Sequence, residues 1–493
     1  MEKQRILKEL EPQKVFYYFE NLMHIPHGSS NEKAISDYIV KLAKKQGYAV
    51  RQDDAYNVVV ELPASSGYEE RKKTIIQAHL DMVCVKDEKS SHDFMKDPID
   101  IYIDGDYIKA KGTSLGADDG SGVALMLAIM TDRKLKHPPL QLLFTTGEEI
   151  LFTGASAMSE DFIEGEQLIG LDCSNSNTIV ASCAGISISH IVMPIERFSV
   201  ERRMKQSGFV IRICGLQSGH SGNLIHTGRV NGIKLLGEIL STLEQKLDYD
   251  VLHINGNGLV NVICGSAEAE ICCCESDEKK VEKTLSQLFQ VIMKAYGRIE
   301  PDLKLSVERK EIGCTAEKLS YTSKKRLLQL IELLPFGVKT MMGEPFNLAE
   351  SSMNIGYVEE GESLKVGISV RSNNEYQHEN LLRKLKYIAE IVDGKFVIER
   401  RSAPWEYNPD SSLRRMAERI YRRQNKQEPE VKVIHASVEA GVFVEKMKRR
   451  GKILDVINIG CDQDNVHTVN ECLKISSVGK VYRFLTALLE ETD

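Results

Sequence analysis

Apolar residues follow two different spacings in the first third of the chain. A spacing of three and four residues, or a longer apolar stretch, predicts helices at 12–23, 31–46 and 123–134. Short alternating or continuous apolar runs predict β-strands at 57–62, 74–79, 140–146 and 167–171. The pair Gly105-Asp106 between two short strand patterns predicts a hairpin over 101–111. Strands that alternate with helices are typical of an α/β fold with a mostly parallel central sheet.

A different pattern begins at residue 186 and extends to 402. Its strand patterns alternate between apolar and polar residues, at 209–216, 267–276, 304–311, 352–372 and 395–401. This alternation is typical of an antiparallel sheet with one exposed face. Two helices are expected between these strands, at 229–247 and 277–296. We therefore interpret residues 186–402 as an α+β insertion.

The alternation of helices and strands resumes after Trp405. Helices are expected at 411–424 and 438–449, strands at 431–437 and 455–460, and a further helix at the end of the chain. The last part of the chain is therefore expected to complete the first domain. This predicts one domain from residues 1–185 and 403–493, and a second domain from residues 186–402.

Composition and charge narrow the class of protein. Hydrophobic residues make up 42% of the 493 residues and charged residues 27%, which is typical of a globular protein with a sizeable core. A net charge of −7 argues against nucleic acid as the main partner, because phosphate binding favours a basic surface. No apolar run approaches the ~20 residues of a membrane span, and the N-terminal segment is too charged for a secretory signal.

The eleven cysteines indicate the compartment rather than a site. No two of them form a CxxC pair, which argues against a zinc ribbon. Scattered cysteines in a large intracellular protein are usually small buried apolar residues. We therefore expect a cytoplasmic protein, without a membrane or nucleic-acid partner.

Metal-type ligands and carboxylates follow several apolar runs of the first domain. They are His79 with Asp81, Asp118, the pair Glu148 and Glu149, Asp172, and His467. In open α/β sheets, ligand sites form where the strands end at the carboxyl edge. Two histidines and several carboxylates at such an edge predict a two-metal hydrolase site.

The first of these groups also have simpler interpretations. His79 and Asp81 are two residues apart, so on a strand both side chains point the same way and Asp81 can hold the imidazole from behind; the alternative is a surface ion pair. Asp118 lies between Gly116 and Gly120 at a helix start, where a carboxylate can bridge two cations or cap the helix. Asp119 is interpreted as a helix cap.

Two adjacent carboxylates, Glu148 and Glu149, repel each other unless a cation or a proton lies between them. We expect one of them to bind metal and the other to take a proton from water, although their position does not say which does which. The alternatives are a solvated helix start for this pair, a turn former for Asp172 and an exposed loop histidine for His467. The joint occurrence of all five features favours the metal site.

Several motifs together resemble the M20 family of di-zinc peptidases, and within it the aminoacyl-histidine dipeptidases. They are QAHLDMVCVK (77–86), HDFMKDPID (92–100), YIDGDYIKAKGTSLGADDGSG (102–122), TGEEILFTGA (146–155), GLDCSN (170–175), GLQSGHSGNLIHTGRVNGIKLL (215–236) and HASVEAGVF (435–443). Their order and spacing agree with the family over nearly the whole chain. The resemblance implies that residues 1–185 and 403–493 form a catalytic domain and that residues 186–402 form its lid.

The resemblance also implies a role for each site residue. One zinc ion is bound by His79 and Asp172, and the second by Glu149 and His467. Asp118 bridges the two ions. Asp81 lies behind His79, and Glu148 is the general base. The family commonly has Asn after the bridging Asp; this chain has Asp119. The implied cofactors are two Zn²⁺ per subunit, with Co²⁺ or Mn²⁺ as possible substitutes.

Three residues of the expected lid resemble substrate contacts of the family: His220 for the oxyanion, Asn261 for the substrate, and Arg371 for the free C-terminal carboxylate, a task that suits a guanidinium. Their alternatives are a turn histidine, a strand asparagine and an exposed arginine. Glu439 is either a contact for the substrate amino group or an ordinary helix residue. A homodimer is possible, and with it a His220 that serves its own or the partner subunit.

The predicted function is hydrolysis of dipeptides, either of the Xaa-His type alone or of a broader range. In this reading Glu148 takes a proton from a water activated by two zinc ions. One alternative is an amidohydrolase of the same fold that acts on N-acyl amino acids. The other is a binding protein that has lost turnover; the presence of all five ligands and the base argues against it.

Overall fold

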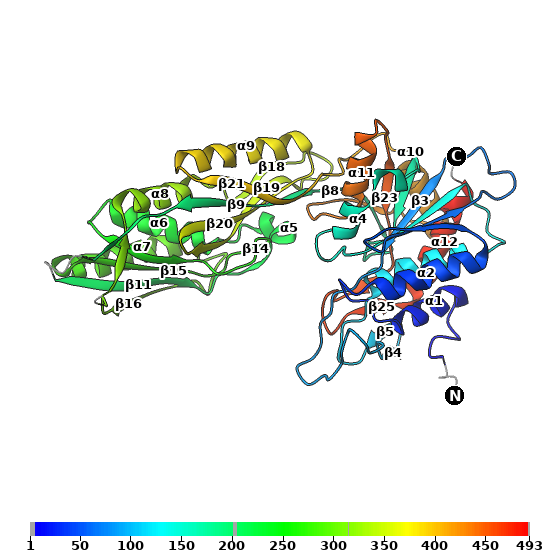
Figure 1. Cartoon of the computed structure of the whole chain (residues 1–493), viewed down its shortest axis with the longest axis horizontal. Coiled ribbons are helices and arrows are strands. Elements are labelled where there is room, and N and C mark those ends of the chain that lie inside the picture. The colour runs from blue at the N-terminus through cyan, green and yellow to red at the C-terminus, as the bar shows by residue number, and fades with distance from the viewer. Residues whose placement is uncertain (1–4, 201–204, 314, 492–493) are drawn as a thin grey trace. The chain divides into compact units, whose positions relative to one another are not determined.

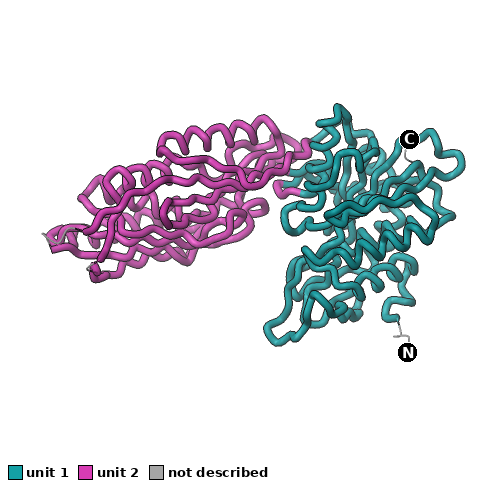
Figure 2. The backbone as a smooth tube through the Cα atoms, in the orientation of Figure 1, with its two compact units in different colours: residues 1–183, 407–434, 438–493 teal, residues 184–406, 435–437 magenta. Residues whose placement is uncertain are grey.

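Two compact units make up the protein, and each has its own hydrophobic core. The computed structural model describes residues 5–200, 205–313 and 315–491. Unit 1 contains the chain up to Cys183, Tyr407–Ile434 and the residues from Val438 onward (Figure 2). Unit 2 contains Ala184–Glu406 and the short segment His435–Ser437. The chain thus leaves and re-enters unit 1 close to the expected boundaries, except that the expected strand 431–437 is divided between the units.

Unit 1 is built on an eight-stranded sheet (Figure 1). Its order is β1 (Ala49–Gln52), β2 (Val58–Leu62), β6 (Leu140–Thr145), β3 (Thr74–His79), β7 (Gln167–Gly170), β23 (Asp455–Asn458), β8 (Thr178–Cys183) and β22 (Glu430–Ile434). The middle strands β6, β3, β7 and β23 are parallel, as are β8 and β22, whereas β1–β2, β2–β6 and β23–β8 are antiparallel contacts. Strands β3, β6 and β7 are buried throughout, which explains their continuous apolar runs. The expected mostly parallel sheet is confirmed.

The predicted helices of unit 1 lie close to their expected positions. They are α1 (Gln13–Met23), α2 (Lys33–Gln46), α3 (Ala117–Met130), α10 (Ser412–Asn425), α11 (Ala440–Arg449) and α12 (Ile475–Glu491). The short helix α4 (Thr153–Ala157) and a 3-10 turn at Glu160–Phe162 were not predicted. Helix α3 packs against α1 and β3 and is buried nearly all round, as the continuous apolar run at 123–130 requires. It begins at Ala117 rather than at residue 123, although Asp118 and Asp119 within it have non-helical dihedral angles.

A small antiparallel sheet brings the end of the chain to the predicted hairpin. Its order is β24 (Gln463–Asp464), β25 (Cys472–Lys474), β5 (Tyr107–Ala110) and β4 (Ile101–Asp104). Gly105 and Asp106 form the hairpin turn, as predicted. His467 lies in the segment between β24 and β25, so it belongs to unit 1 as expected.

Unit 2 contains two antiparallel sheets. One has the order β13 (Asp250–Asn255), β15 (Ala267–Cys274), β11 (Gln206–Cys214) and β16 (Lys304–Lys310). The other has the order β18 (Gly337–Met341), β19 (Ala349–Glu360), β20 (Ser363–Ser372), β9 (Gly185–Pro194) and β21 (Lys395–Ser402). Two strand pairs are separate: β10 (Arg197–Ser199) with β17 (Glu317–Leu319), and β12 (Gly219–His220) with β14 (Val262–Ile263).

The expectation of two helices in unit 2 is wrong. Besides α6 (Gly232–Glu244) and α7 (Glu278–Tyr296), the unit has α8 (Tyr321–Leu333) and α9 (Glu375–Ile391), with short turns at α5 (Ser221–Leu224), η2 (Ile225–Thr227) and η3 (Glu275–Asp277). The buried residues Leu381, Leu385 and Ile388 of α9 recur at helical spacing, so the sequence carried the signal. Helix α9 lies between the strands β20 and β21, whose alternating patterns led us to expect only strands there. Within the described residues, no helix is long and apolar enough to cross a membrane.

Candidate metal centre

Three neighbouring parallel strands of unit 1 bring the predicted ligands to one edge of the sheet. Strand β3 lies between β6 and β7 and ends at His79. The Glu148–Glu149 pair follows β6, and Asp172 follows β7. Because parallel strands end at the same edge, these side chains converge there, as the strand patterns predicted.

Two groups of metal-type ligands meet at Asp118. One group is His79, Asp118 and Asp172, and the other is Asp118, Glu149 and His467; within each, one ligand atom per residue lies within 4.8 Å of the others. Asp118 Oδ1 lies 3.0 Å from His79 Nε2, and Oδ2 lies 3.5 Å from His467 Nε2. Glu149 Oε1 lies 2.8 Å from His467 Nε2. The structure therefore brings all five predicted ligands together, with Asp118 between the two groups.

The turn that carries Asp118 is held by a residue from the far end of the chain. Glu471 accepts hydrogen bonds from four successive backbone N–H groups: one oxygen from Leu115 (2.8 Å) and Gly116 (3.1 Å), the other from Ala117 (2.8 Å) and Asp118 (3.3 Å). Gly116 has a φ of +74°, which favours glycine, and a side chain there would contact Met82. Glu471 was not among the predicted site residues, and no local spacing points to it.

Asp119 has a different role from its neighbour. Its Oδ1 accepts the backbone N–H of Gly122 at 3.1 Å, the geometry of a helix N-cap. The side chain is fully buried, and burial raises its pKa well above the ordinary value. The structure thus favours the cap interpretation for Asp119, while Asp118 faces the two imidazoles.

Asp81 contacts three parts of the site. His79 Nδ1 lies 3.0 Å from the backbone oxygen of Asp81 and 3.5 Å from its Oδ1. If Nδ1 carries the proton, Nε2 keeps its lone pair for a metal ion. Asp81 also accepts the backbone N–H groups of Glu148 (Oδ1, 3.0 Å) and Glu149 (Oδ2, 3.3 Å), and the hydroxyl of Ser29 (2.8 Å). Strand β3 ends at His79, so Asp81 is not on the strand, but its backbone oxygen and its carboxylate both lie beside the imidazole. The same carboxylate also holds the turn of the glutamate pair.

The turn before the glutamates is held in a similar way. Asn57 accepts the N–H of Thr146 at 3.0 Å, and Glu32 accepts the N–H of Gly147 at 3.1 Å. With the two bonds to Asp81, four successive N–H groups bind side-chain oxygens. Gly147 has a φ of +59°, and a side chain there would collide with Thr153. Both ligand-bearing turns are thus fixed by side chains from other segments.

Negative charge is in excess at this centre. Six carboxylates gather there: Asp81, Asp118, Asp119, Glu148, Glu149 and Asp172. In the described part of the chain, none of them forms an ion pair with a lysine or an arginine. Burial and the nearby Asp118 raise the pKa of Asp172 to about 7, and burial raises the pKa of Glu148 well above its ordinary value. Carboxylates so arranged require protons or cations.

The nearby carboxylates raise the pKa values of both histidines. Hydrogen bonds to Asp118 and Glu149 raise the pKa of His467 to about 10. Burial acts to lower the pKa of His79, but the contacts with Asp118 and Asp81 outweigh it and raise this pKa well above the ordinary value. Imidazole nitrogens and carboxylate oxygens are the ligands that zinc and similar divalent ions prefer. The residues therefore fit two divalent cations.

Glu439 lies at the N-cap position of α11 and is only 2% exposed. Its Oε2 accepts hydrogen bonds from Gln77 Nε2 (2.8 Å) and Thr145 Oγ1 (2.5 Å), while its Oε1 is buried and has no hydrogen-bond partner within the described part of the chain. Burial raises its pKa to about 8. Its burial argues against an ordinary exposed helix residue, whereas a contact with the substrate amino group stays a prediction.

The predicted substrate contacts lie in unit 2. Arg371 on β20 is 4% exposed, with Nη2 3.3 Å from His220 Nε2 and Nη1 3.5 Å from Ser437 Oγ. Burial lowers its pKa to about 10. Among the described residues Arg371 forms no ion pair with an acid, and the alternative of an exposed arginine is wrong.

His220 and Asn261 are neighbours in the fold. Strand β12, which ends at His220, pairs with β14, and the N–H of Ser221 donates to the backbone oxygen of Asn261 at 2.8 Å. His220 is thus on a short strand rather than in a turn. The structure brings His220 together with both Arg371 and Asn261, as one polar group within unit 2.

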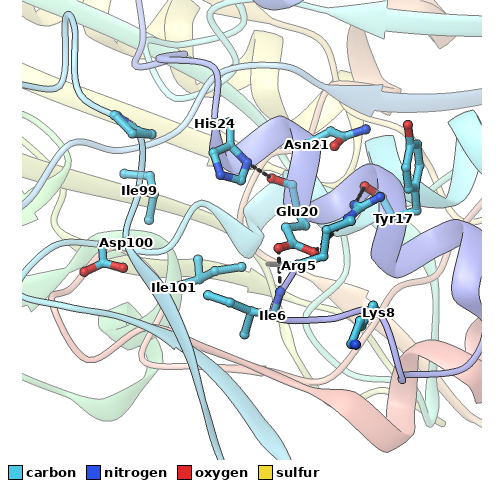
Figure 3. A pocket seen from close by; sticks show the side chains of 11 residues that line it. Arg5, Ile6, Lys8, Tyr17, Glu20, Asn21, His24, Ile99, Asp100 and Ile101 are labelled. Atoms are coloured by element: carbon cyan, nitrogen blue, oxygen red, sulfur yellow. Dashed lines mark hydrogen bonds and ion pairs between the residues drawn. The ribbon is translucent and has the colours of Figure 1, made fainter. Parts of the chain in front are cut away.

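A hollow of about 970 Å³ elsewhere on unit 1 does not contain any predicted site residue (Figure 3). Figure 3 shows Arg5 and the backbone of Ile6 bonded to the carboxylate of Glu20 inside it, at 3.3 Å and 2.8 Å. His24 Nδ1 contacts the backbone oxygen of Glu20 at 2.6 Å. The buried acid of this hollow is already partnered, so nothing there indicates a ligand.

Comparisons with known proteins agree with the fold and identify the family. The model of peptidase family M20/M25/M40 matches residues 75–491. The cytosol non-specific dipeptidase of Escherichia coli (strain K12) is 31% identical over 486 residues, 98% of this chain and 99% of that protein. The crystal structure of aminoacylhistidine dipeptidase from Vibrio alginolyticus has a TM-score of 0.89 and 30% identity, and the match covers 100% of this chain and 99% of that chain.

More distant structures share the fold alone. Aminopeptidase PepT from Bacillus cereus has a TM-score of 0.55 at 14% identity, over 98% of this chain and 99% of that chain. The M20 resemblance found in the motifs is confirmed by the family match, which spans most of the chain. The chain therefore belongs to peptidase family M20/M25/M40.

Proposed function

We propose that the protein is a metallo-dipeptidase that hydrolyses dipeptides, of the Xaa-His type and others, with two zinc ions per chain. The observation that carries this proposal is the meeting of two ligand groups at Asp118, with Glu148 beside them. The similarity to the E. coli and Vibrio dipeptidases along nearly the full length of each chain supports the substrate class.

The ligand groups assign a set of residues to each ion. His79 and Asp172 would hold one ion, Glu149 and His467 the other, and Asp118 both. Nitrogen and oxygen ligands suit zinc, with cobalt or manganese as possible substitutes. When bound, such ions lower the pKa of a coordinated water towards ~7 and polarise the substrate carbonyl.

Glu148 is the general base in this proposal. Its backbone is fixed by Asp81, and burial raises the pKa of its carboxyl, the direction that suits a base working near neutral pH. Glu148 takes a proton as water attacks the scissile carbonyl and returns it to the leaving amine. Glu149 is held by the same carboxylate of Asp81 but contacts His467, which suits it to metal binding instead.

Unit 2 acts as the lid and supplies the substrate contacts. Arg371 binds the free C-terminal carboxylate of the dipeptide, since a guanidinium can donate two parallel hydrogen bonds to it. Its burial without an acidic partner among the described residues supports this role, because an unpaired buried cation favours an anionic ligand. His220 stabilises the developing oxyanion, and Asn261 binds the substrate. Closure of the lid would limit substrates to dipeptides.

Two further proposed properties of the enzyme are its cellular location and its oligomeric state. A cytoplasmic location is supported by the cytosolic E. coli relative. The homodimer that the sequence left open, with His220 in the same or the partner subunit, stays a prediction. Neither an N-acyl amino acid amidohydrolase nor a non-catalytic binding protein is favoured, because the E. coli and Vibrio relatives, which are 31% and 30% identical and match along nearly their whole length, are named dipeptidases.

The test is a screen of dipeptides, tripeptides and N-acyl amino acids with the purified, zinc-loaded protein. Release of free amino acids from dipeptides is expected, with loss of activity in the chelator-treated protein. The Glu148→Gln variant is the matched control, since it should bind zinc without turnover. Hydrolysis of N-acyl amino acids but not of dipeptides would support the amidohydrolase instead.

A further inference from the structure

Glu471 is a buried carboxylate that the proposed reaction does not use. It is 3% exposed, and both of its oxygens are occupied by the N–H groups of residues 115–118. A carboxylate has about four lone-pair sites, so this side chain uses its full capacity on one turn. That turn carries Asp118, the residue shared by both ligand groups.

The same segment of the chain holds this turn a second time. Gln463 Nε2 donates to the backbone oxygen of Ala117 at 3.1 Å and to Ser121 Oγ at 3.0 Å. Gln463 and Glu471 lie on either side of His467 in the sequence. Hydrogen bonds therefore join the segment that carries His467, on both sides of this residue, to the turn that carries Asp118.

We propose that Glu471 is a positioning residue for the metal pair, which sets the Asp118 carboxylate against His467 so that one carboxylate can serve two ions. This inference rests on the proposed metal site. Hydrogen bonds from N–H groups to a carboxylate are charge-assisted and stronger than neutral ones. A neutral amide at this position can accept on one side only, and its NH₂ group would face two N–H donors.

Loss of Glu471 is expected to change metal binding specifically. Without Glu471, the turn is free to shift and to displace Asp118. Because Asp118 is proposed to bind both ions, its displacement weakens the binding of both at once. Residues behind metal ligands typically contribute about 10–100-fold in metal affinity or activity. A carboxylate that served only the stability of the fold would instead leave the affinity of the folded protein for zinc unchanged.

The experiment compares Glu471→Gln with wild type and with a matched control. Glu300 is a fully buried glutamate of unit 2 that accepts the backbone N–H groups of Gln217 (2.7 Å) and Val230 (2.9 Å) and belongs to no ligand group. The Glu300→Gln variant therefore loses a similar interaction without touching the metal centre. Zinc dissociation constants are measured by competition with a chromophoric chelator, alongside the thermal midpoint of each protein.

We expect both zinc ions to bind about 10–100-fold more weakly in Glu471→Gln, and within twofold of wild type in Glu300→Gln. Folded Glu471→Gln that keeps wild-type zinc affinity would overturn the inference. If that variant does not fold, Glu471→Asp gives the same comparison, because it keeps the charge but is too short to bind all four N–H groups. Failure of the wild type to bind zinc at all would contradict the proposed function itself, which makes the two failures distinguishable.

Discussion

The carboxylate of Asp81 accepts the backbone N–H of Glu148 at a distance of 3.0 Å. Its second oxygen accepts the N–H of Glu149 at 3.3 Å, and His79 lies against the same carboxylate. One side chain therefore contacts two proposed metal ligands, His79 and Glu149, and the proposed base Glu148. This links residues that the sequence separates by nearly seventy positions, since Glu148 is 67 residues from Asp81.

We predict that Asp81→Asn lowers both zinc affinity and kcat, each by about 10–100-fold. The amide keeps the shape but can accept only on one side, so either His79 or the glutamate pair loses its partner. Zinc content and steady-state kinetics at saturating zinc measure the two effects separately. Ser29→Ala removes only one of the hydrogen bonds to the same carboxylate and leaves those to His79 and the glutamate pair, so it should have a smaller effect. Full recovery of kcat with excess zinc would show that Asp81 acts on His79 alone.

We predict that Glu148→Gln keeps both metal ions and nearly abolishes turnover. The amide matches the carboxylate in shape but does not accept a proton, and removal of a general base typically costs ~10²–10⁴-fold in rate. Elemental analysis measures the metal content of the variant, and kcat measures its turnover. Glu149→Gln is the paired variant and should lose metal as well as rate. A wild-type rate in Glu148→Gln would exclude Glu148 as the base.

We predict that Asp118→Ala loses metal and not only rate, because its carboxylate belongs to both ligand groups. Asp119→Asn is the neighbouring control: Asn caps helices as well as Asp does, so this variant should keep both ions. Elemental analysis of the dialysed proteins is the measurement. Two zinc ions per chain in Asp118→Ala would rule out the bridge.

We predict that blocking the C-terminus of a dipeptide as an amide raises KM or lowers kcat sharply in wild type, but changes little in Arg371→Ala. In wild type the buried guanidinium is left without its anion, whereas the variant has no guanidinium to leave unpaired. Comparing both proteins with both substrates isolates this one interaction. Equal penalties in the two proteins would place the carboxylate site elsewhere.

We predict that Glu439 makes the metal-free protein less stable as pH rises. An acid whose pKa is raised on folding stabilises fully below its ordinary pKa of 4.5, and this stability is lost as pH rises through the folded value of about 8. Glu439→Gln stays neutral, so its stability relative to wild type should increase between pH 5 and 8, by up to about 1.4 kcal/mol per pH unit.

Urea unfolding of the chelator-treated wild type and Glu439→Gln at several pH values measures this difference. Both proteins carry the other acids of the centre, so the comparison isolates Glu439. A difference in unfolding free energy that does not change with pH would mean that Glu439 is already ionised in the folded protein.

Local sequence patterns were enough to locate many helices and strands of unit 1. Continuous apolar runs predicted β3 and β6 almost to the residue, because strands that are buried on both faces are apolar throughout. The Gly105-Asp106 turn predicted the hairpin. Most ligands of the candidate site were visible because they follow a buried strand or open a helix; His467 instead lies in a loop. Which glutamate binds metal came from the family resemblance, since two adjacent carboxylates look alike in the sequence.

Contacts between distant segments were decided by the tertiary structure alone. Glu471 lies 356 residues from Leu115, and Arg371 lies 151 residues from His220, so no periodicity connects them. The burial of Arg371 and Glu439 was equally hidden, because charged residues usually lie at the surface. Side-chain spacing reports which face of an element is buried, whereas the partner of a buried polar group depends on strand order and on the path of the loops.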